Sequence, residues 1–227
     1  MQEKVLLRLH VEAVWGVRVP AIAGNEVFLL PEGLQPSWAV YVAEVTRERI
    51  YIWRPDVDAR LALLERVDEA LSEAVEGVAT PGIVREVALH QIARPTMDVE
   101  VARQIARPLT ERDRALIEEF EPESAKYFLD ARRAPLFGVI AEGKLVSIAH
   151  SSRRTEQACE LGIETHPDAR RRGYALASTV LWAEAVAQEG LVPFYSALAE
   201  NSASLRLAHA AGYRVFARGA TIEGLME

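Results

Sequence analysis

The chain has 227 residues with a formal net charge of −7, and 50% of its residues are apolar and 26% charged. This balance is typical of a globular protein that buries its core without disulfide or metal staples. It argues against a general nucleic-acid-binding surface and leaves room only for a local anion site. The single cysteine, Cys159, excludes an intramolecular disulfide and a zinc site built on several thiolates.

The first residues are interrupted by charges, with no apolar core of the signal type, and no stretch approaches the roughly 18–20 apolar residues of a membrane-spanning helix. We therefore expect a cytoplasmic protein that binds neither membrane nor nucleic acid.

Residues 1–103 predict a small α/β domain of unknown role. Stretches rich in Val, Ile, Leu and aromatic residues, separated by Pro and Gly, indicate strands. The expected strands are Glu26–Leu30, Ala39–Val45, Arg49–Trp53 and Ile83–Leu89. Leucines at helical spacing predict one helix between Pro55 and Gly77. Core positions are expected for Trp15, Trp38 and Trp53.

Residues 104–227 predict a second domain with the element order β-α-α-β-β-β-α-β-α-β. The expected strands are Gln104–Leu109, Leu136–Ala141, Leu145–Ser151, Ala158–Thr165, Leu191–Leu198 and a last one from Tyr213. The expected helices are Thr110–Phe120, Ser124–Arg133, Arg171–Glu189 and Ser202–Ala211. The turn Glu142-Gly143-Lys144 joins two of the strands as a hairpin.

The segment from His166 to Ala175 leaves a predicted strand and opens a long apolar helix. The first amide groups of a helix lack intrahelical partners, and the helix dipole adds positive charge there, so this point favours an anion such as phosphate. Gly173 allows close approach of a ligand to the backbone. Arg170, Arg171 and Arg172 add positive charge.

The pattern Arg170-x-x-Gly173-x-Ala175 resembles the acyl-CoA pyrophosphate loop of GNAT-type N-acetyltransferases. Asn201-x-x-Ser204, followed by Gly212-Tyr213, resembles the later helix and strand of that fold. The resemblance implies an α/β fold of the α+β type, with a mixed central sheet and flanking helices. It also implies acetyl-CoA as co-substrate and no metal. The residues it implies at the cofactor are Ile163, Thr165, Arg170, Arg171, Arg172, Gly173, Tyr174, Ala175, Asn201 and Ser204.

Side chains alternate between the two faces of the strand Ala158–Thr165, so Glu160 and Glu164 share one face. If that face lines a cleft, either carboxylate is a candidate base for the ammonium group of an acceptor. If it faces solvent, both are ordinary surface charges. We favour Glu160 over Glu164. Glu160 lies farther from the pyrophosphate loop, and the acetyl group is expected on that far side, because the cofactor arm runs back along the strand from the loop. His150 is a third candidate.

The sequence departs from the family pattern at the proton donor for the leaving thiol. Many relatives carry a Tyr seven positions after the Asn, whereas this chain has Ala208. His209 points about 100° around the helix, and Tyr195 has no motif in its favour. Two hypotheses follow: an N-acetyltransferase that moves acetyl to a primary amine by direct attack in a ternary complex, or a non-catalytic acyl-CoA-binding protein on the same fold. A homodimer is compatible with either.

Overall fold

The computed structural model describes residues 2–46, 48–58, 60–72 and 80–224, and the chain divides into two compact units. The first unit comprises Met1–Leu89, Ser196–Leu205 and Val215–Glu227. The second comprises His90–Tyr195 and Arg206–Arg214. The chain thus returns to the first unit near its C-terminus, while the domain change predicted near residue 103 stays a prediction.

The first unit contains a sheet with the strand order β1-β3-β2-β10-β4. Its strands are β1 (Glu26–Phe28), β2 (Trp38–Val45), β3 (Glu48–Trp53), β4 (Ile83–Gln91) and β10 (Tyr213–Glu223). Its helices are α1 (Glu3–Trp15), α2 (Arg60–Leu64) and α3 (Val67–Leu71). The predicted strands are confirmed. Helix α1 was not predicted, and it ends at Gly16, which has left-handed backbone angles.

The single helix predicted between Pro55 and Gly77 is wrong for the described residues, because α2 and α3 are separate short helices. Their buried residues are Leu63, Val67 and Ala70, whereas Leu61, one of the leucines of the predicted helix, is 81% exposed. The last part of the predicted helix, residues 73–79, lies outside the described residues.

Helices α2 and α3 cover one face of this sheet, where their apolar side chains pack on Val40, Val42 and Ile222. On the other face Tyr41 donates a hydrogen bond of 2.7 Å to Glu86 Oε1, which also lies 3.0 Å from His10 Nε2 of α1. Burial raises the pKa of Glu86, but the contacts with His10 and Tyr41 outweigh it, so its pKa is lowered overall. This polar group ties α1 to the sheet.

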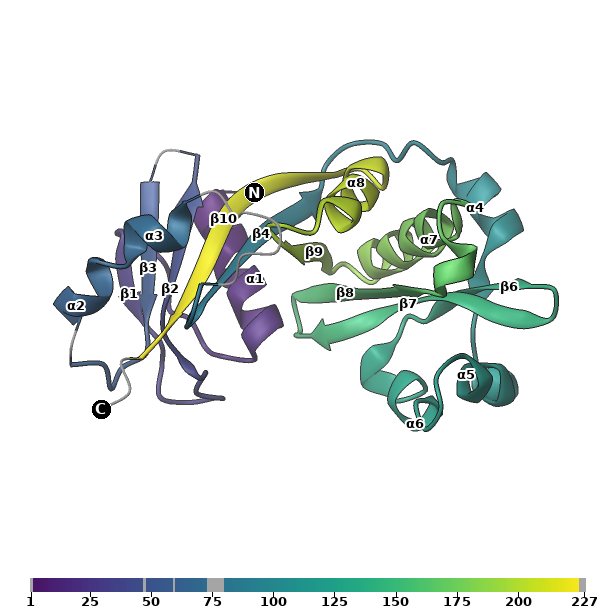
Figure 1. The fold of residues 1–227 in the computed structure, drawn as a ribbon, viewed down its shortest axis with the longest axis horizontal. Helices are drawn as coiled ribbons and strands as arrows, with labels where there is room; N and C mark the ends of the chain where they lie inside the picture. The colour runs from purple at the N-terminus through teal and green to yellow at the C-terminus, as the bar shows by residue number, and fades with distance from the viewer. Residues whose placement is uncertain (1, 47, 59, 73–79, 225–227) are drawn as a thin grey trace. The chain divides into compact units, whose positions relative to one another are not determined.

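The second unit contains a sheet with the strand order β9-β8-β7-β6-β5. Its strands are β5 (Arg107–Pro108), β6 (Phe137–Ala141), β7 (Lys144–Arg154), β8 (Ala158–Thr165) and the first residues of β9 (Val192–Leu198). Its helices are α4 (Val99–Ile105), α5 (Arg114–Phe120), α6 (Ala125–Phe128), α7 (Tyr174–Gln188) and the end of α8 (Ser202–Ala210). Helix α7 lies on one face of β6, β7 and β8, and α5 and α6 lie on the other (Figure 1).

Most predicted elements of this unit are confirmed, with two corrections. The strand predicted at Gln104–Leu109 is mostly wrong, because α4 runs through Ile105 and only Arg107–Pro108 pair with β6. Asp98 caps α4 by accepting a hydrogen bond from Glu100 N. The helix predicted at Ser124–Arg133 is a short α6 followed by a separate 3₁₀ turn, Ala131–Arg133.

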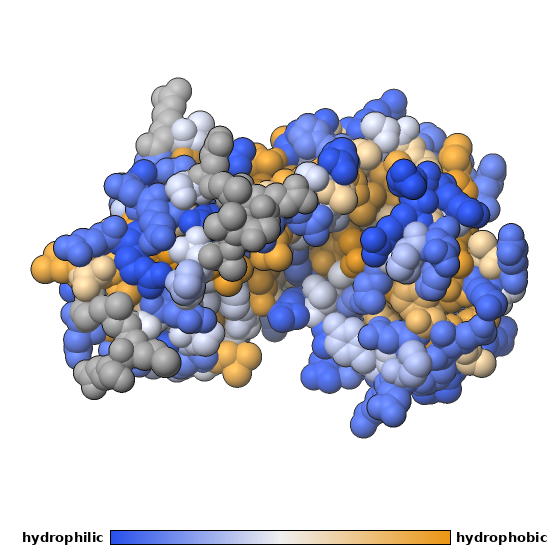
Figure 2. Space-filling view, viewed as in Figure 1, coloured by the Kyte–Doolittle hydropathy of each residue, from blue (hydrophilic) through white to orange (hydrophobic). Residues whose placement is uncertain are grey.

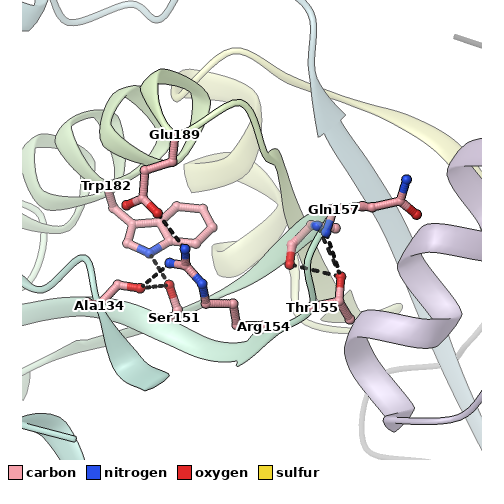
Figure 3. Close-up of polar contacts among 8 residues, drawn as sticks. Ala134, Ser151, Arg154, Thr155, Gln157, Trp182 and Glu189 are labelled. Carbon is pink, nitrogen blue, oxygen red and sulfur yellow. Dashed lines mark hydrogen bonds and ion pairs between the residues drawn. The ribbon is translucent and has the colours of Figure 1, made fainter. Parts of the chain in front are cut away.

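A buried polar network fixes α7 on β7 (Figure 3). Trp182 Nε1 donates to Ser151 Oγ at 3.2 Å, and that hydroxyl donates to the carbonyl of Ala134 at 2.8 Å. Arg154 donates to the same carbonyl and pairs with Glu189 beyond the end of α7. These contacts therefore hold the middle and the C-terminal end of α7 against β7.

Hydrophilic residues cover much of the visible rim of the second unit, with apolar residues showing between them (Figure 2). Cys159 is buried in this unit, and burial raises the pKa of its thiol, so it is an unreactive core residue. In the first unit Trp38 and Trp53 are fully buried core residues, and Trp15 packs edge-on against Trp38 at 5.9 Å.

Candidate functional site

The backbone of β8 has an open edge in its second half. Strand β9 pairs in parallel with β8 only at Ala158, Cys159 and Glu160, among the residues that the structure describes. The opposite edge pairs with β7 along its length, and His166 N donates to Val146 O. Because backbone groups alternate between neighbouring strands, the N–H and C=O groups of Ile163 and Thr165 point to the open side. This edge can accept an extended ligand as an added strand would.

The loop at the end of β8 is preorganised for an anion. Arg171 and Gly173 have positive φ angles of 61° and 82°, and Gly173 is the residue that precedes α7. The first hydrogen bond within α7 runs from Ala177 N to Gly173 O, so the amides of Tyr174 and Ala175 precede it. Residues with left-handed angles at such a turn direct backbone N–H groups toward one point, which favours phosphate.

The three arginines of this loop, Arg170, Arg171 and Arg172, are exposed, while Tyr174 and Ala175 are partly buried. A cavity of about 440 Å³ lies beside the loop, between the end of α5, the β6–β7 turn and the segment His166–Tyr174. Side chains of both signs line it, including Lys144, which lies 3.5 Å from Glu119. One side of the loop is therefore open to a ligand.

Asn201 and Ser204 belong to the first unit, whereas all the other predicted cofactor residues belong to the second. Asn201 Oδ1 accepts a hydrogen bond of 3.0 Å from Ser204 N and thereby caps α8. Asn is a common capping residue at the start of a helix. A cofactor role for these two residues stays a prediction.

Glu160 and Glu164 share the α5–α6 face of β8 but differ in environment. Glu160 is 5% exposed, and its carbonyl accepts a hydrogen bond from Ser152 Oγ at a bulge in β7. Glu164 is exposed at the end of the strand. Partial desolvation and, secondly, the negative charge of Glu121 raise the pKa of Glu164. Glu160 is therefore the deeper of the two and lies where β9 separates from β8. Glu164 is the shallower one and lies near the loop that follows β8.

His150 lies directly over Gly162, its partner on β8. A Cβ atom at Gly162 would come within 2.2 Å of His150 Cε1, so the imidazole leans across β8. Burial, and secondly the charge of Arg133, lower the pKa of His150 to about 4. His150 is 3% exposed, and its Nε2 is hydrogen-bonded to Tyr127 Oη at 3.3 Å. The imidazole is therefore neutral at neutral pH.

Tyr127 and Arg133 are two residues of this face that the sequence did not single out. The guanidinium of Arg133 lies 4.0 Å from the ring centre of Tyr127, which is 41% exposed. Arg133 also donates to the carbonyl of Ser152 at the β7 bulge. Both residues lie on short elements of the α5–α6 layer, and only their packing brings them to β7. No spacing in the sequence signals that contact.

Ala208, which stands at the position where the resemblance led us to expect a tyrosine as proton donor, is fully buried. Tyr195 is also buried and packs edge-on against Tyr213, with ring centres 5.5 Å apart. Desolvation, and secondly the charge of Glu160, raise the pKa of Tyr213 well above its usual value. Neither tyrosine is open to solvent.

The second unit thus has a mixed sheet flanked by helices, with an open strand edge and a glycine-containing loop before a long helix, which is the arrangement that the sequence resemblance predicted. The family model for GNAT acetyltransferases matches residues 86–217, which is more than half of the chain. The chain therefore belongs to the GNAT acetyltransferase family, whose members are acyltransferases. No curated protein matches it.

Three solved structures share the fold. A GNAT acetyltransferase from Novosphingobium aromaticivorans is 23% identical, with a TM-score of 0.51 and coverage of 78% of this chain and 84% of that one. One from Colwellia psychrerythraea is 16% identical, with a TM-score of 0.52 and coverage of 76% and 75%. A GCN5-related N-acetyltransferase-like protein from Streptococcus suis is 14% identical, with a TM-score of 0.52 and coverage of 98% and 93%.

Two other kinds of site have no candidates within the described ranges. No helix there is both long and apolar enough to cross a membrane. No group of three or more His, Cys, Asp or Glu side chains there has an arrangement that could hold a metal ion.

Proposed function

We propose that the protein is an acetyl-CoA-dependent N-acetyltransferase that moves an acetyl group to a primary amine of an unidentified acceptor, by direct attack in a ternary complex. The observation that carries this proposal is the open edge of β8 leading into the loop Arg170–Ala175. An extended arm fits the edge, and a pyrophosphate fits the amides at the start of α7. Acetyl-CoA has both parts and supplies the activated acetyl group.

Different residues of the chain bind the cofactor and accept the proton. The amides of Gly173, Tyr174 and Ala175 hold the pyrophosphate, and the exposed arginines before them add charge. The backbones of Ile163 and Thr165 hold the arm. Glu160 takes the proton from the acceptor's ammonium group, since it is the last residue of β8 that pairs with β9 and so stands where the two strands separate. No covalent enzyme intermediate is needed.

The buried Ala208 favours a second candidate, a non-catalytic acyl-CoA-binding protein, because that position supplies no proton for the leaving thiol. The two functions share cofactor binding and differ in turnover. Acetyl transfer to an amine separates them.

Cofactor binding is tested by replacing Gly173 with Val. We expect acetyl-CoA, but not acetate, to raise the melting temperature of the wild type, because a ligand that binds only the native state stabilises it. In Gly173→Val the shift should disappear, since a β-branched residue does not hold the φ of 82° found there. Gly190→Val is the matched control: φ is 79° at the other end of α7, with no atom within 4 Å of a Cβ. If acetyl-CoA raised the melting temperature of both variants equally, the loop before α7 would not be part of the cofactor site.

The proton acceptor is tested by Glu160→Gln with Glu164→Gln as its control. We expect Glu160→Gln to lower turnover by roughly a hundredfold with little change in acetyl-CoA affinity, because only the neutral amine attacks. Glu164→Gln, at the exposed end of the same face, should do less. Turnover across pH with a confirmed acceptor is the measurement. Near-native turnover in Glu160→Gln would mean that another group accepts the proton.

A further inference from the structure

The hydroxyl group of Tyr127 stands on the same face as the proposed reaction and is not used by it. The leaving sulfur of a thioester gains a proton during acetyl transfer, and the buried methyl group of Ala208 provides none. We propose, on the basis of the proposed function, that Tyr127 is the catalytic proton donor to the leaving thiolate and that His150 is its positioning residue.

The hydroxyl of Tyr127 is held over the open half of β8. The imidazole of His150 leans across β8 over Gly162, the second residue of β8 beyond its last pair with β9. The hydroxyl of Tyr127 is bonded to the far nitrogen, Nε2, of that ring. The His150 ring occupies the space that a side chain at Gly162 would fill, and it places the hydroxyl of Tyr127 on the α5–α6 side of the strand whose open edge accepts the arm of the cofactor.

The protonation of His150 leaves the hydroxyl proton of Tyr127 available. His150 Nδ1 is buried and has no hydrogen-bond partner among the described residues. A buried N–H without a partner costs more than a bare ring nitrogen, so the ring proton belongs on Nε2. Nε2–H then donates to Tyr127 Oη. The hydroxyl proton of Tyr127 is free to point away from His150 and to be donated to a ligand.

Neighbouring side chains hold the pair rigidly. The ring of Phe128 packs edge-on against His150 with centres 5.0 Å apart, and Arg133 covers the ring of Tyr127 at 4.0 Å. Arg133 is itself bonded to the carbonyl of Ser152. Both side chains of the pair are thus fixed, while 41% of Tyr127 stays accessible, as a residue that meets a ligand requires.

In the acetyl-transfer step, each bond that forms is matched by a bond that breaks, and each proton has a donor and an acceptor. The amine nitrogen, after losing its proton to Glu160, forms a bond to the thioester carbon. The carbon–sulfur bond breaks, and the sulfur leaves with the electron pair and takes the phenolic proton of Tyr127. The phenolate regains a proton from water on its exposed side. His150 stays neutral throughout, donating from Nε2 to the oxygen that changes charge.

The first test needs no substrate. The imidazole ¹⁵N signals of His150 are assigned as those that disappear from the spectrum of His150→Gln. At neutral pH these signals should show a neutral ring with its proton on Nε2. A proton on Nδ1 would overturn the inference, because Tyr127 would then donate to His150 and hold no proton for a ligand.

The second test measures thiol release from acetyl-CoA with an acceptor amine. Tyr127→Phe should lower kcat roughly ten- to hundredfold, with KM for both substrates and the acetyl-CoA melting shift unchanged. His150→Ala should lower kcat similarly, and His150→Gln should recover part of the loss, because its amide nitrogen replaces Nε2 as donor. Tyr51→Phe, in the first unit, is the control for the substitution itself.

Wild-type kcat in Tyr127→Phe would overturn the inference and leave the proposed function intact. A higher KM for the amine with unchanged kcat would also overturn it, by making Tyr127 an acceptor contact. A wild type that binds acetyl-CoA but acetylates no amine contradicts the proposed function itself, and that result is distinct from both of these.

Discussion

Replacing Gly162 with Ala is expected to disrupt the site and destabilise the second unit. The new Cβ would lie 2.2–2.9 Å from three atoms of the His150 ring, which is buried and packs edge-on against both Tyr127 and Phe128. Overpacking of this kind costs roughly 1–3 kcal/mol. Turnover should fall at least as far as in Tyr127→Phe, because the ring can no longer hold the hydroxyl.

The measurements are denaturant unfolding and turnover, with Gly24→Ala as control, since a Cβ there meets no atom within 4 Å. Wild-type stability and activity in Gly162→Ala would show that His150 does not lie over β8.

The pH dependence of stability gives this prediction a second readout. His150 has a pKa of about 4 in the native protein, below its ordinary value of 6.5, so the unfolded chain binds more protons between these values. The contribution of the neutral His150 ring to the free energy of unfolding is fully present above about pH 6.5. It is lost as the pH falls toward 4, and the total loss is roughly 3 kcal/mol. Displacing the ring into water should raise the pKa of His150 and flatten this slope in Gly162→Ala.

Replacing Gly219 with Ala is expected to destabilise the first unit and to weaken the attachment of α1 to its sheet. Gly219 lies on β10, between Tyr41 on β2 and Glu86 on β4. The hydroxyl of Tyr41 crosses over it to reach Glu86, and a Cβ would meet that oxygen at 2.2 Å. Moving Tyr41 breaks a bond to a buried carboxylate, so we expect a loss of roughly 2–4 kcal/mol from overpacking and the lost hydrogen bond together.

The measurement is unfolding of the full chain by denaturant, followed by hydrogen exchange of the α1 amides. Gly224→Ala, just beyond the end of β10, is the control, because a Cβ there comes no closer than 3.8 Å to Ala39. Unchanged exchange in α1 together with unchanged stability would mean that Tyr41 does not pass over Gly219.

Local patterns predicted the elements around the loop, because each pattern has a local physical cause. Glu142-Gly143 adopts positive φ angles of 52° and 79°, as the predicted hairpin turn requires. The helix predicted at Thr110–Phe120 begins as a 3₁₀ turn, Glu111–Asp113, which Thr110 caps, and continues as α5. The helix predicted at 55–77 failed because its leucines do not form one buried face: Leu63 is buried and Leu61 is exposed. Helix α1 has no side-chain cap to mark its start, and Gln2 at that position makes no capping bond.

The parts of the candidate site that are formed by residues close in sequence could be predicted. The parts that are formed by tertiary packing of distant residues could not. The loop Arg170–Ala175 and the face shared by Glu160 and Glu164 follow from one continuous segment of strand, turn and helix. The contact between Tyr127 and His150 spans 23 residues and depends on a single-turn helix. The sequence made His150 a candidate, but the lowered pKa that keeps it neutral comes from burial and from Arg133, which no pattern reveals.

Acetylation of a primary amine is the most direct test of the proposed function. The wild-type protein is incubated with acetyl-CoA and a panel of small amines and peptides, and both thiol release and acetylated product are measured, with Gly173→Val as the matched variant. We predict that at least one amine gains an acetyl group in step with thiol release, and that Gly173→Val loses both signals. Tight binding of acetyl-CoA with no acetylated amine across the panel would contradict the proposed function and favour the non-catalytic acyl-CoA-binding protein.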